Sequence, residues 1–116
     1  MNKKFLMYSS DGVKVVKEKQ FKHFLYYKNT LHELPSGITA ERYSNCLCFM
    51  KYHSNNHPVI KVSVKRNNNY IKRNVYIGGY EELFNYMLKH KEETMLFVGF
   101  NRAIIGRIFA KFSENL

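Results

Sequence analysis

Acidic residues are scarce in this chain, and tryptophan is absent. Nine Asp and Glu oppose nineteen Lys and Arg, so the formal net charge is +10 and the sequence pI is about 9.7. A charge of this size on a small protein concentrates polyanions near it, among them DNA, RNA, anionic membranes and acidic proteins. The net charge alone does not choose between these partners.

Cysteine and long apolar runs are also rare. The two cysteines, Cys46 and Cys48, are one residue apart. Strand residues at that spacing point to one face roughly 7 Å apart, which is poor geometry for a disulfide, so the pair indicates a reducing, cytoplasmic location. The apolar run from Phe5 to Tyr8 is too short for a signal sequence, and no run approaches the roughly 18 residues of a membrane span. We therefore expect no membrane partner.

Apolar and aromatic residues, by contrast, are plentiful. Hydrophobic residues make up 45% of the 116 residues and aromatic residues 16%, which argues against a disordered chain. A chain of this length builds one domain. We expect an N-terminal appendage over 1–36, a sheet-plus-helix unit over 37–93, and a strand and helix over 94–116 that pack on the core or on a second copy of the chain.

The N-terminal third contains three predicted elements. Residues 3–17 are expected to form two short strands around a turn at Ser9 to Gly12, because Asp-Gly favours a tight hairpin turn. The spacing of the apolar residues in 18–27 predicts a short helix, although their aromatic density also suits a strand. Residues 29–40 contain proline and glycine and are expected to form a loop.

Three strands are predicted in the middle of the chain. The runs 45–53, 59–66 and 70–78 are rich in β-branched and aromatic residues, and turn-forming residues separate them. Between the second and third runs lie three asparagines at 67–69, which tolerate the left-handed conformation of a tight turn. We therefore expect three antiparallel strands joined by two tight turns.

Two helices and a further strand are predicted after these strands. Apolar residues recur at helical spacing over 80–93, and Glu81 and Glu82 stand where the helix dipole favours acids. Residues 95–100 are expected to form a short strand, followed by a helix with Asn101 as its N-cap. The expected fold class is α+β, a three-stranded antiparallel sheet packed on an amphipathic helix, with N-terminal and C-terminal α/β extensions.

The positive charge is concentrated in the predicted sheet. No acidic residue lies between Arg42 and Tyr80. Lys61, Ser63 and Lys65 share one face of the second strand because strand side chains alternate. Pairing around the asparagine turn is expected to place Ile71 and Val75 on the apolar face and to bring to the basic face Tyr70, Lys72, Asn74 and Tyr76.

A basic face of this kind suits a nucleic acid, because Lys and Arg hold phosphates while Asn, Arg and Tyr reach base edges or stack. The residues expected to bind phosphates are Lys61, Lys65, Lys72 and Arg73. The residues expected to contact bases are Arg42, Ser63, Arg66 and Asn74. Lys51 and Tyr70 complete the predicted contact set. The alternative is that the lysines only keep an exposed sheet soluble and protect its edges.

Five segments in the middle of the chain follow an order known from a DNA-binding family. In order they are a first strand after a glycine-containing lead-in (GITAERYSNCLCFMKYH), a basic strand (VIKVSVKR), a polar turn (NNN), a strand that ends in glycine (YIKRNVYIG), and a helix with an acidic start (YEELFNYMLKHKEE). Residues 37–93 thereby resemble the AP2-like domains of phage and bacterial proteins. The resemblance implies a three-stranded sheet in the major groove of duplex DNA, although the tryptophan that many members place in the first or second strand is missing. It assigns contacts to Arg42, Lys51, Lys61, Ser63, Lys65, Arg66, Lys72 and Asn74.

Enzymatic and metal-dependent functions have little support in the sequence. Cys46, Cys48, His53 and His57 are residue types that bind zinc, but their spacing matches no familiar structural site. His53, Asn56 and His57 lack the acidic partners of His/Asn nucleases. We expect no catalytic residue, no cofactor and no metal.

The sequence therefore predicts a non-enzymatic nucleic-acid-binding protein, with duplex DNA favoured. A second hypothesis is a small phage-type inhibitor, of the anti-CRISPR or anti-restriction kind, that binds a host protein or a nucleoprotein complex. A third is an RNA-binding module in which Tyr70 and Tyr76 stack on unpaired bases. The segment 100–112 has a basic and an apolar side, which suits packing on the core or a homodimer helix better than a membrane surface.

Overall fold

The structure of the protein is a computed structural model that describes residues 4–9, 12–17, 23–34 and 40–115. Near the N-terminus, β1 (Lys4–Ser9) and β2 (Gly12–Lys17) pair antiparallel in a two-stranded sheet of their own. The two strands expected over 3–17 are confirmed. The turn residues Ser10 and Asp11 lie outside the described residues.

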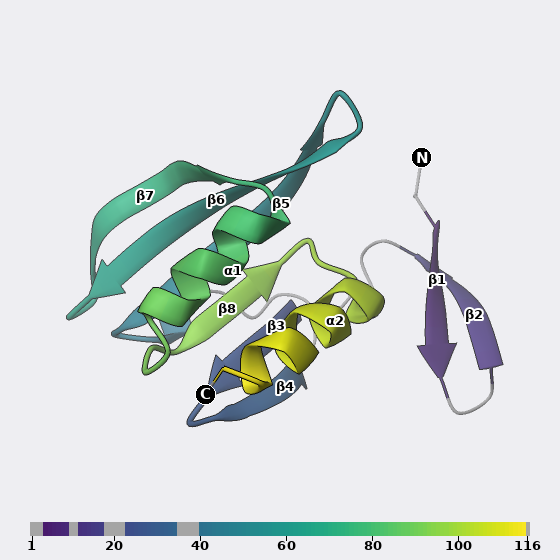
Figure 1. Cartoon of the computed structure of the whole chain (residues 1–116), viewed down its shortest axis with the longest axis horizontal. Helices are drawn as coiled ribbons and strands as arrows, with labels where there is room; N and C mark the ends of the chain where they lie inside the picture. Colours follow the sequence, from purple (N-terminus) through teal and green to yellow (C-terminus); the bar gives the residue numbers. More distant parts are fainter. Residues whose placement is uncertain (1–3, 10–11, 18–22, 35–39, 116) are drawn as a thin grey trace.

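The other strands form one sheet of six (Figure 1). In spatial order they are β4 (Thr30–Leu34), β3 (His23–Tyr27), β8 (Met95–Val98), β5 (Cys46–Ser54), β6 (His57–Arg66) and β7 (Asn69–Gly78). Neighbours run antiparallel except β5 and β8, which are parallel. The remaining elements are the helices α1 (Tyr80–Lys89) and α2 (Arg102–Ser113) and the 3₁₀ turn η2 (Ala40–Arg42).

The expected three-stranded sheet on one helix is therefore wrong. The predicted strands β5, β6 and β7 exist and pair as a meander, but they are half of a six-stranded mixed sheet with two helices. A strand was expected over 95–100, and Met95–Val98 of that run forms the interior strand β8 between β3 and β5. Its first three residues are buried, as is typical of a strand covered on both faces.

The helix expected over 18–27 is also wrong where the structure describes that segment, because His23–Tyr27 is β3. Phe24 and Tyr26 belong to the core beneath the helices, and Leu25 belongs to the cluster on the opposite face. A strand buried on both faces has consecutive apolar residues, and such a run also satisfies helical spacing. Residues 18–22 lie outside the described residues.

The loop expected over 29–40 contains a strand, β4. Lys28 and Asn29 form a two-residue turn between β3 and β4 with φ of 49° and 64°. Positive φ at both central residues is the mark of a type I′ hairpin turn. The same turn joins β5 to β6 at Asn55 and Asn56, and β6 to β7 at Asn67 and Asn68. The expected use of asparagine in left-handed turn positions is confirmed.

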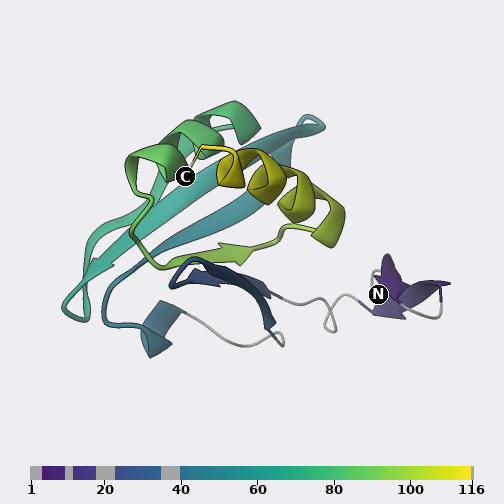
Figure 2. The same cartoon turned by 60° about the horizontal axis from the view of Figure 1, so that its bottom comes forward.

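Both helices lie on one side of the six-stranded sheet (Figure 2). The apolar stripe expected on the first helix is confirmed, since α1 buries Leu83, Phe84 and Met87, although the helix ends at Lys89 rather than near residue 93. The expected N-cap of the second helix is also confirmed, because the Asn101 side chain accepts a hydrogen bond from the backbone N–H of Ile104 at 2.8 Å. The buried residues of α2 are Ile105, Ile108, Phe109 and Phe112.

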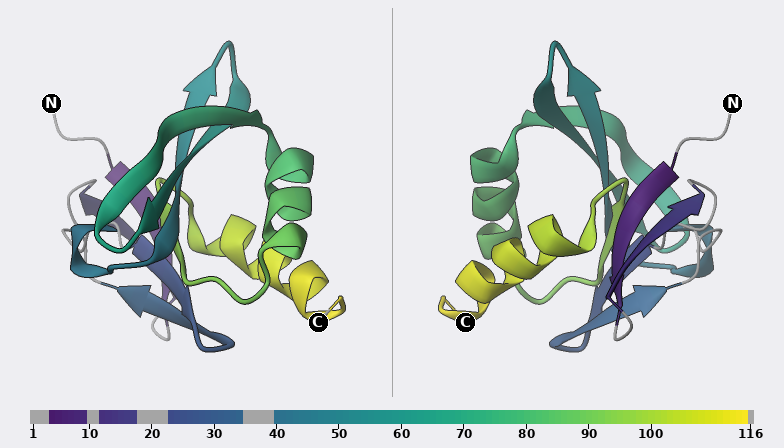
Figure 3. Two further views of the ribbon diagram at one scale, coloured as in Figure 1. Left: turned by 90° about the vertical axis from the view of Figure 1, so that its left-hand side faces the viewer. Right: turned by 90° about the vertical axis from the view of Figure 1, so that its right-hand side faces the viewer.

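The sheet thus has a helix-covered face and an opposite face. On the opposite face a second apolar cluster contains Leu25, Cys46, Cys48 and Leu96 beneath Ala40 of η2. Figure 3 shows β7 as a strongly bent ribbon at the end of the sheet. Within the described residues, no helix has the length and apolar character needed to cross a membrane.

Candidate nucleic-acid interface

Acidic side chains are almost absent from the six-stranded sheet. Within its strands Glu33 is the one acidic residue, against Lys51, Lys61, Lys65, Arg66, Lys72 and Arg73. Glu33 pairs with Phe24, a residue of the helix-covered core, and its carboxylate binds the guanidinium of Arg102 in α2 at 2.6 Å. The opposite face therefore carries no carboxylate from any strand.

We call one part of that opposite face the open face. It belongs to β5, β6 and β7, and it consists of Met50, Tyr52, Lys61, Ser63, Tyr70, Arg73, Asn74 and Tyr76. Lys61 pairs across the sheet with Met50 on one side and with Tyr76 on the other. Its Nζ lies 5.3 Å from the ring centroid of Tyr52, within reach of a cation–π interaction. Tyr52 is 40% exposed and Tyr76 64% exposed, so Lys61 stands between two solvent-facing tyrosines.

The pairing of β7 differs from the expected alternation at Lys72. Tyr70 pairs with Lys65 and Tyr76 pairs with Lys61, but Lys72 pairs with Val64 of the core. Irregularities in the β6–β7 register cause this change, and a bulge reverses the face of the residues beyond it. Lys72 therefore lies on the side of the helix-covered core, away from the tyrosines.

Asn74 occupies the centre of the irregular stretch. Its φ is 52°, in the left-handed region, and its backbone N–H donates to Ser63 Oγ at 2.9 Å. The Ser63 hydroxyl lies 3.4 Å from Asn74 Oδ1. A bulge stabilised by these contacts turns Asn74 and Arg73 towards Ser63 and Tyr70. Val75 joins the apolar side opposite Val62, as expected, while Ile71 is 61% exposed.

A second aromatic and cationic group forms where β7 meets η2. The Tyr70 hydroxyl donates to Glu41 Oε1 at 2.9 Å, and the guanidinium of Arg73 lies over the Tyr70 ring with 4.0 Å between Cζ and the ring centroid. Burial and the bond to Glu41 raise the pKa of Tyr70 to about 12, so this phenol stays protonated. Arg73 is exposed beyond the ring and can meet a phosphate.

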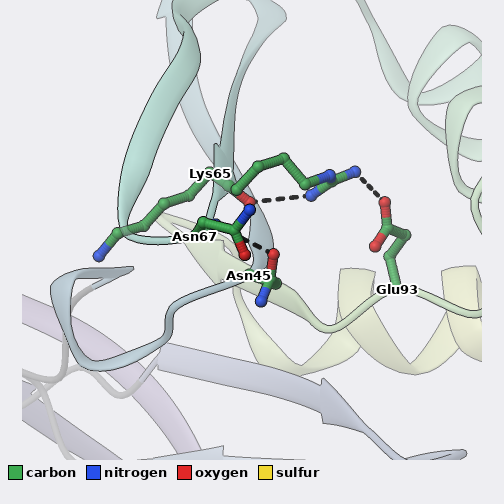
Figure 4. A network of polar contacts seen from close by, with 5 residues as sticks. Asn45, Lys65, Asn67 and Glu93 are labelled. Atoms are coloured by element: carbon green, nitrogen blue, oxygen red, sulfur yellow. Dashed lines mark hydrogen bonds and ion pairs between the residues drawn. The ribbon is translucent and has the colours of Figure 1, made fainter.

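Two of the predicted contact residues, Lys65 and Arg66, form bonds within the protein. Lys65 is 4% exposed, and its Nζ donates to the Ala40 carbonyl at 3.2 Å. Arg66 forms an ion pair with Glu93 and donates to the Lys65 carbonyl at 2.9 Å. Figure 4 shows the ion pair at Glu93 and the bond to the Lys65 carbonyl, together with the bond from the Asn67 N–H to Asn45 Oδ1. Lys65 and Arg66 therefore join the meander to its neighbours.

The other predicted residues lie in different places. Arg42 is exposed in η2. Lys51 lies on the helix-covered side, with its Nζ 5.7 Å from the ring centroid of Tyr80 and 6.0 Å from that of Phe100. The structure therefore brings together five of the ten predicted contact residues on the open face, and these are Lys61, Ser63, Tyr70, Arg73 and Asn74.

Sequence reasoning missed Tyr52 and Met50 as parts of this surface. The Tyr52 hydroxyl lies 3.7 Å from the sulfur of Met50, so these two side chains are in contact and form the surface of β5 beside Lys61. The alternation of side chains along β5 was sufficient to place Tyr52 and Met50 on one face of the strand. Their cross-strand pairing, Met50 with Lys61 and Tyr52 with Val59, depends on the hairpin turn.

The cysteines lie beneath this surface and form no metal centre with the neighbouring histidines. Both are buried, and burial raises the pKa of the Cys48 thiol to about 12. His53 and His57 are exposed near the β5–β6 turn. Among the described residues there is no group of three or more His, Cys, Asp or Glu that is arranged to hold a metal ion.

Comparison with known proteins adds no assignment. No family model, no curated protein and no solved structure matches the chain. The AP2-like resemblance therefore stays a prediction.

Proposed function

We propose that this protein binds nucleic acid through the open face, with Lys61 at its centre. The observation that carries the proposal is the position of Lys61 between Tyr52 and Tyr76, on a face to which no strand contributes a carboxylate. Cations and exposed aromatic rings on one surface are the two components of nucleic-acid binding by sheets.

Each component has a defined role in the proposal. Lys61 and Arg73 neutralise phosphates, and the counterions released from the nucleic acid supply a large share of the affinity. Tyr52 and Tyr76 offer ring faces to bases or sugars, and one base stacked on an aromatic ring contributes about 1–3 kcal/mol. The two cations lie next to aromatic rings, Tyr52 and Tyr70, so charge and stacking act at the same place.

A surface that serves only solubility explains this arrangement less well. Lysines alone keep an exposed sheet soluble and guard its edges. The open face adds tyrosines that are 40% and 64% exposed, and aromatic residues on a surface are a mark of interaction sites.

The proposed activity is binding rather than catalysis. The thiols of Cys46 and Cys48 are buried and their pKa values are raised, so they are weak nucleophiles. Two free thiols, buried on strand β5, also fit a cytoplasmic location, which we include in the proposal.

Charge reversal tests the proposal. We expect K61E combined with R73E to abolish binding of fluorescent DNA and RNA oligonucleotides at low salt, measured by fluorescence anisotropy. The matched control is R107E combined with K89E, which reverses one exposed cation on each helix, on the far side of the sheet, and changes the net charge by the same amount. Equal losses in the two double variants would show that only net charge matters. Absence of binding by the unmodified protein to any nucleic acid at low salt overturns the proposal.

A further inference from the structure

The open face contains a cavity of about 270 Å³. Its apolar lining is formed by Ala40, Cys48, Met50, Leu96 and Val98. Its polar lining is formed by His23, Glu41, Ser63, Tyr70, Arg73 and Asn74. Ser63 is two residues from Lys61 on β6, and Met50 touches Tyr52, so the cavity adjoins the tyrosines and the central lysine.

We propose that this cavity receives one unpaired base of the strand that the open face binds, an inference that rests on the proposed function. Ligand pockets generally measure about 300–1,000 Å³, so a cavity of this size suits a single base rather than a longer segment. An apolar lining with a few polar groups is also the usual composition of a small-ligand site. Here the sheet supplies the apolar part through Cys48, Leu96 and Val98.

The charges around the cavity distinguish a base from a phosphate. Glu41 contributes a carboxylate to the lining and accepts the hydrogen bond of Tyr70. A carboxylate repels a phosphate, whereas it accepts hydrogen bonds from the N–H groups at base edges. Asn74 adds an amide that complements base edges in the same way. Arg73, the exposed cation of the lining, lies over the Tyr70 ring and can meet a phosphate outside the cavity, so the rest of the lining fits an uncharged ring with N–H groups.

Arg73 and Lys61 lie where the sugar-phosphate backbone of the bound nucleic acid has to pass. Arg73 is exposed above the Tyr70 ring, and Lys61 lies beyond Met50 and Ser63 along the sheet. Phosphates held by these two side chains leave the base between them directed towards the cavity. A base inside a duplex reaches such a site only after it is unpaired and unstacked, which costs a few kcal/mol. The cavity therefore favours single-stranded nucleic acid over the duplex expected from the sequence.

Strands with and without bases test this inference directly. The probes are labelled oligothymidylate, an abasic strand of equal length and charge, and the duplex of the same length, each measured by anisotropy. We expect oligothymidylate to bind about tenfold more tightly than the duplex, and more than tenfold more tightly than the abasic strand, which lacks the enclosed base and also the bases that stack on Tyr52 and Tyr76. Equal affinity for the strand and the duplex overturns the inference alone. Equal affinity for oligothymidylate and the abasic strand overturns the inference together with the stacking role of these tyrosines, while phosphate binding by Lys61 and Arg73 stands.

Filling the cavity is the complementary test. V98F adds a ring at the cavity wall, and we expect it to lower oligothymidylate affinity about tenfold while the affinity for the abasic strand stays unchanged. V75F is the matched control because Val75 is 43% exposed on the helix-covered side of β7. M50W fills the same cavity from β5. If circular dichroism shows a folding defect in V98F, the oligothymidylate affinity of M50W provides the test instead. Unchanged affinity in a folded cavity variant overturns the inference, and absence of binding to all three probes overturns the proposed function with it.

Discussion

The guanidinium of Arg73 rests on the ring of Tyr70, with 4.0 Å between Cζ and the ring centroid, and the Tyr70 hydroxyl donates to Glu41. These contacts connect the bent strand β7 to η2. Arg73 is thereby held in place by its flat face while its N–H groups remain able to meet a phosphate.

This arrangement predicts that R73K weakens nucleic-acid binding although it preserves the charge. Lysine cannot stack as a planar group or form a bidentate contact, so we expect affinity to fall several-fold. The control is R42K, because Arg42 is an exposed arginine in η2 outside the Tyr70 stack. Anisotropy titrations at one salt concentration make the comparison. A loss in R42K as large as that in R73K contradicts a special role for the stack.

The raised pKa of Tyr70 predicts a particular alkaline behaviour. The tyrosine deprotonates at about 12 instead of its ordinary 10.0, because burial and Glu41 disfavour the phenolate. A group whose pKa is higher in the folded state stabilises the fold below its unfolded value, so this stability is lost as pH rises from 10 to 12. Ultraviolet titration is expected to show one fewer late-titrating tyrosine in Y70F, because Tyr26 and Tyr86, whose pKa values are also raised by burial, titrate late in both proteins.

The stability of Y70F checks the same relationship. We expect the free energy of unfolding to fall less steeply between pH 10 and 12 in Y70F than in the unmodified protein. Part of the alkaline loss remains, because burial raises the pKa of Cys48 from 9.0 to about 12 and its contribution falls in an overlapping range. Identical pH profiles in the two proteins contradict the assignment to Tyr70.

Local patterns predicted most of the meander and both helices, but not the sheet around them. The strand pattern of β5–β7, the asparagine turns and the stripe of α1 are set by neighbouring residues in the sequence. The insertion of β8 between β3 and β5 depends on pairing with distant segments, which no local period encodes. β3 was mistaken for a helix because both of its faces are buried.

The candidate site was predicted in part for the same reason. The alternation of side chains placed Lys61 and Ser63 on one face. The structural contacts of Lys65 and Arg66, by contrast, are made with Ala40 and Glu93, which lie far away in the sequence. Register irregularities on both sides of Lys72 place it on the other side of β7 from Tyr70 and Tyr76. A bulge inserts a residue without a composition signal, so strict alternation fails beyond it.

The buried amine of Lys65 predicts a structural rather than a binding role. K65M keeps the length and apolar character of the side chain but leaves the Ala40 carbonyl without its hydrogen bond. We expect a loss of about 1–3 kcal/mol in the free energy of unfolding, measured by urea denaturation. K61M, on the open face of the same strand, is expected to change stability by less than about 0.5 kcal/mol. Comparable losses in both variants contradict the distinction.

Charge and stacking on the open face are separable by their dependence on salt. Each phosphate neutralised contributes a slope of about 0.9 for duplex DNA, or about 0.7 for a single strand, to the fall of log K with log salt. K61Q is therefore expected to reduce that slope by about one such unit. Y76A removes a ring but no charge, so we expect it to lower affinity by about 1–3 kcal/mol at an unchanged slope.

Tyr27 supplies the matched control for the stacking role. It is exposed like Tyr76, at 41% against 64%, but it lies on β3, outside the open face. Y27A is expected to leave both the affinity and the salt slope unchanged. If Y76A behaves like Y27A while K61Q lowers the slope, the open face binds only the phosphate backbone, and the tyrosines beside Lys61 do not stack on bases.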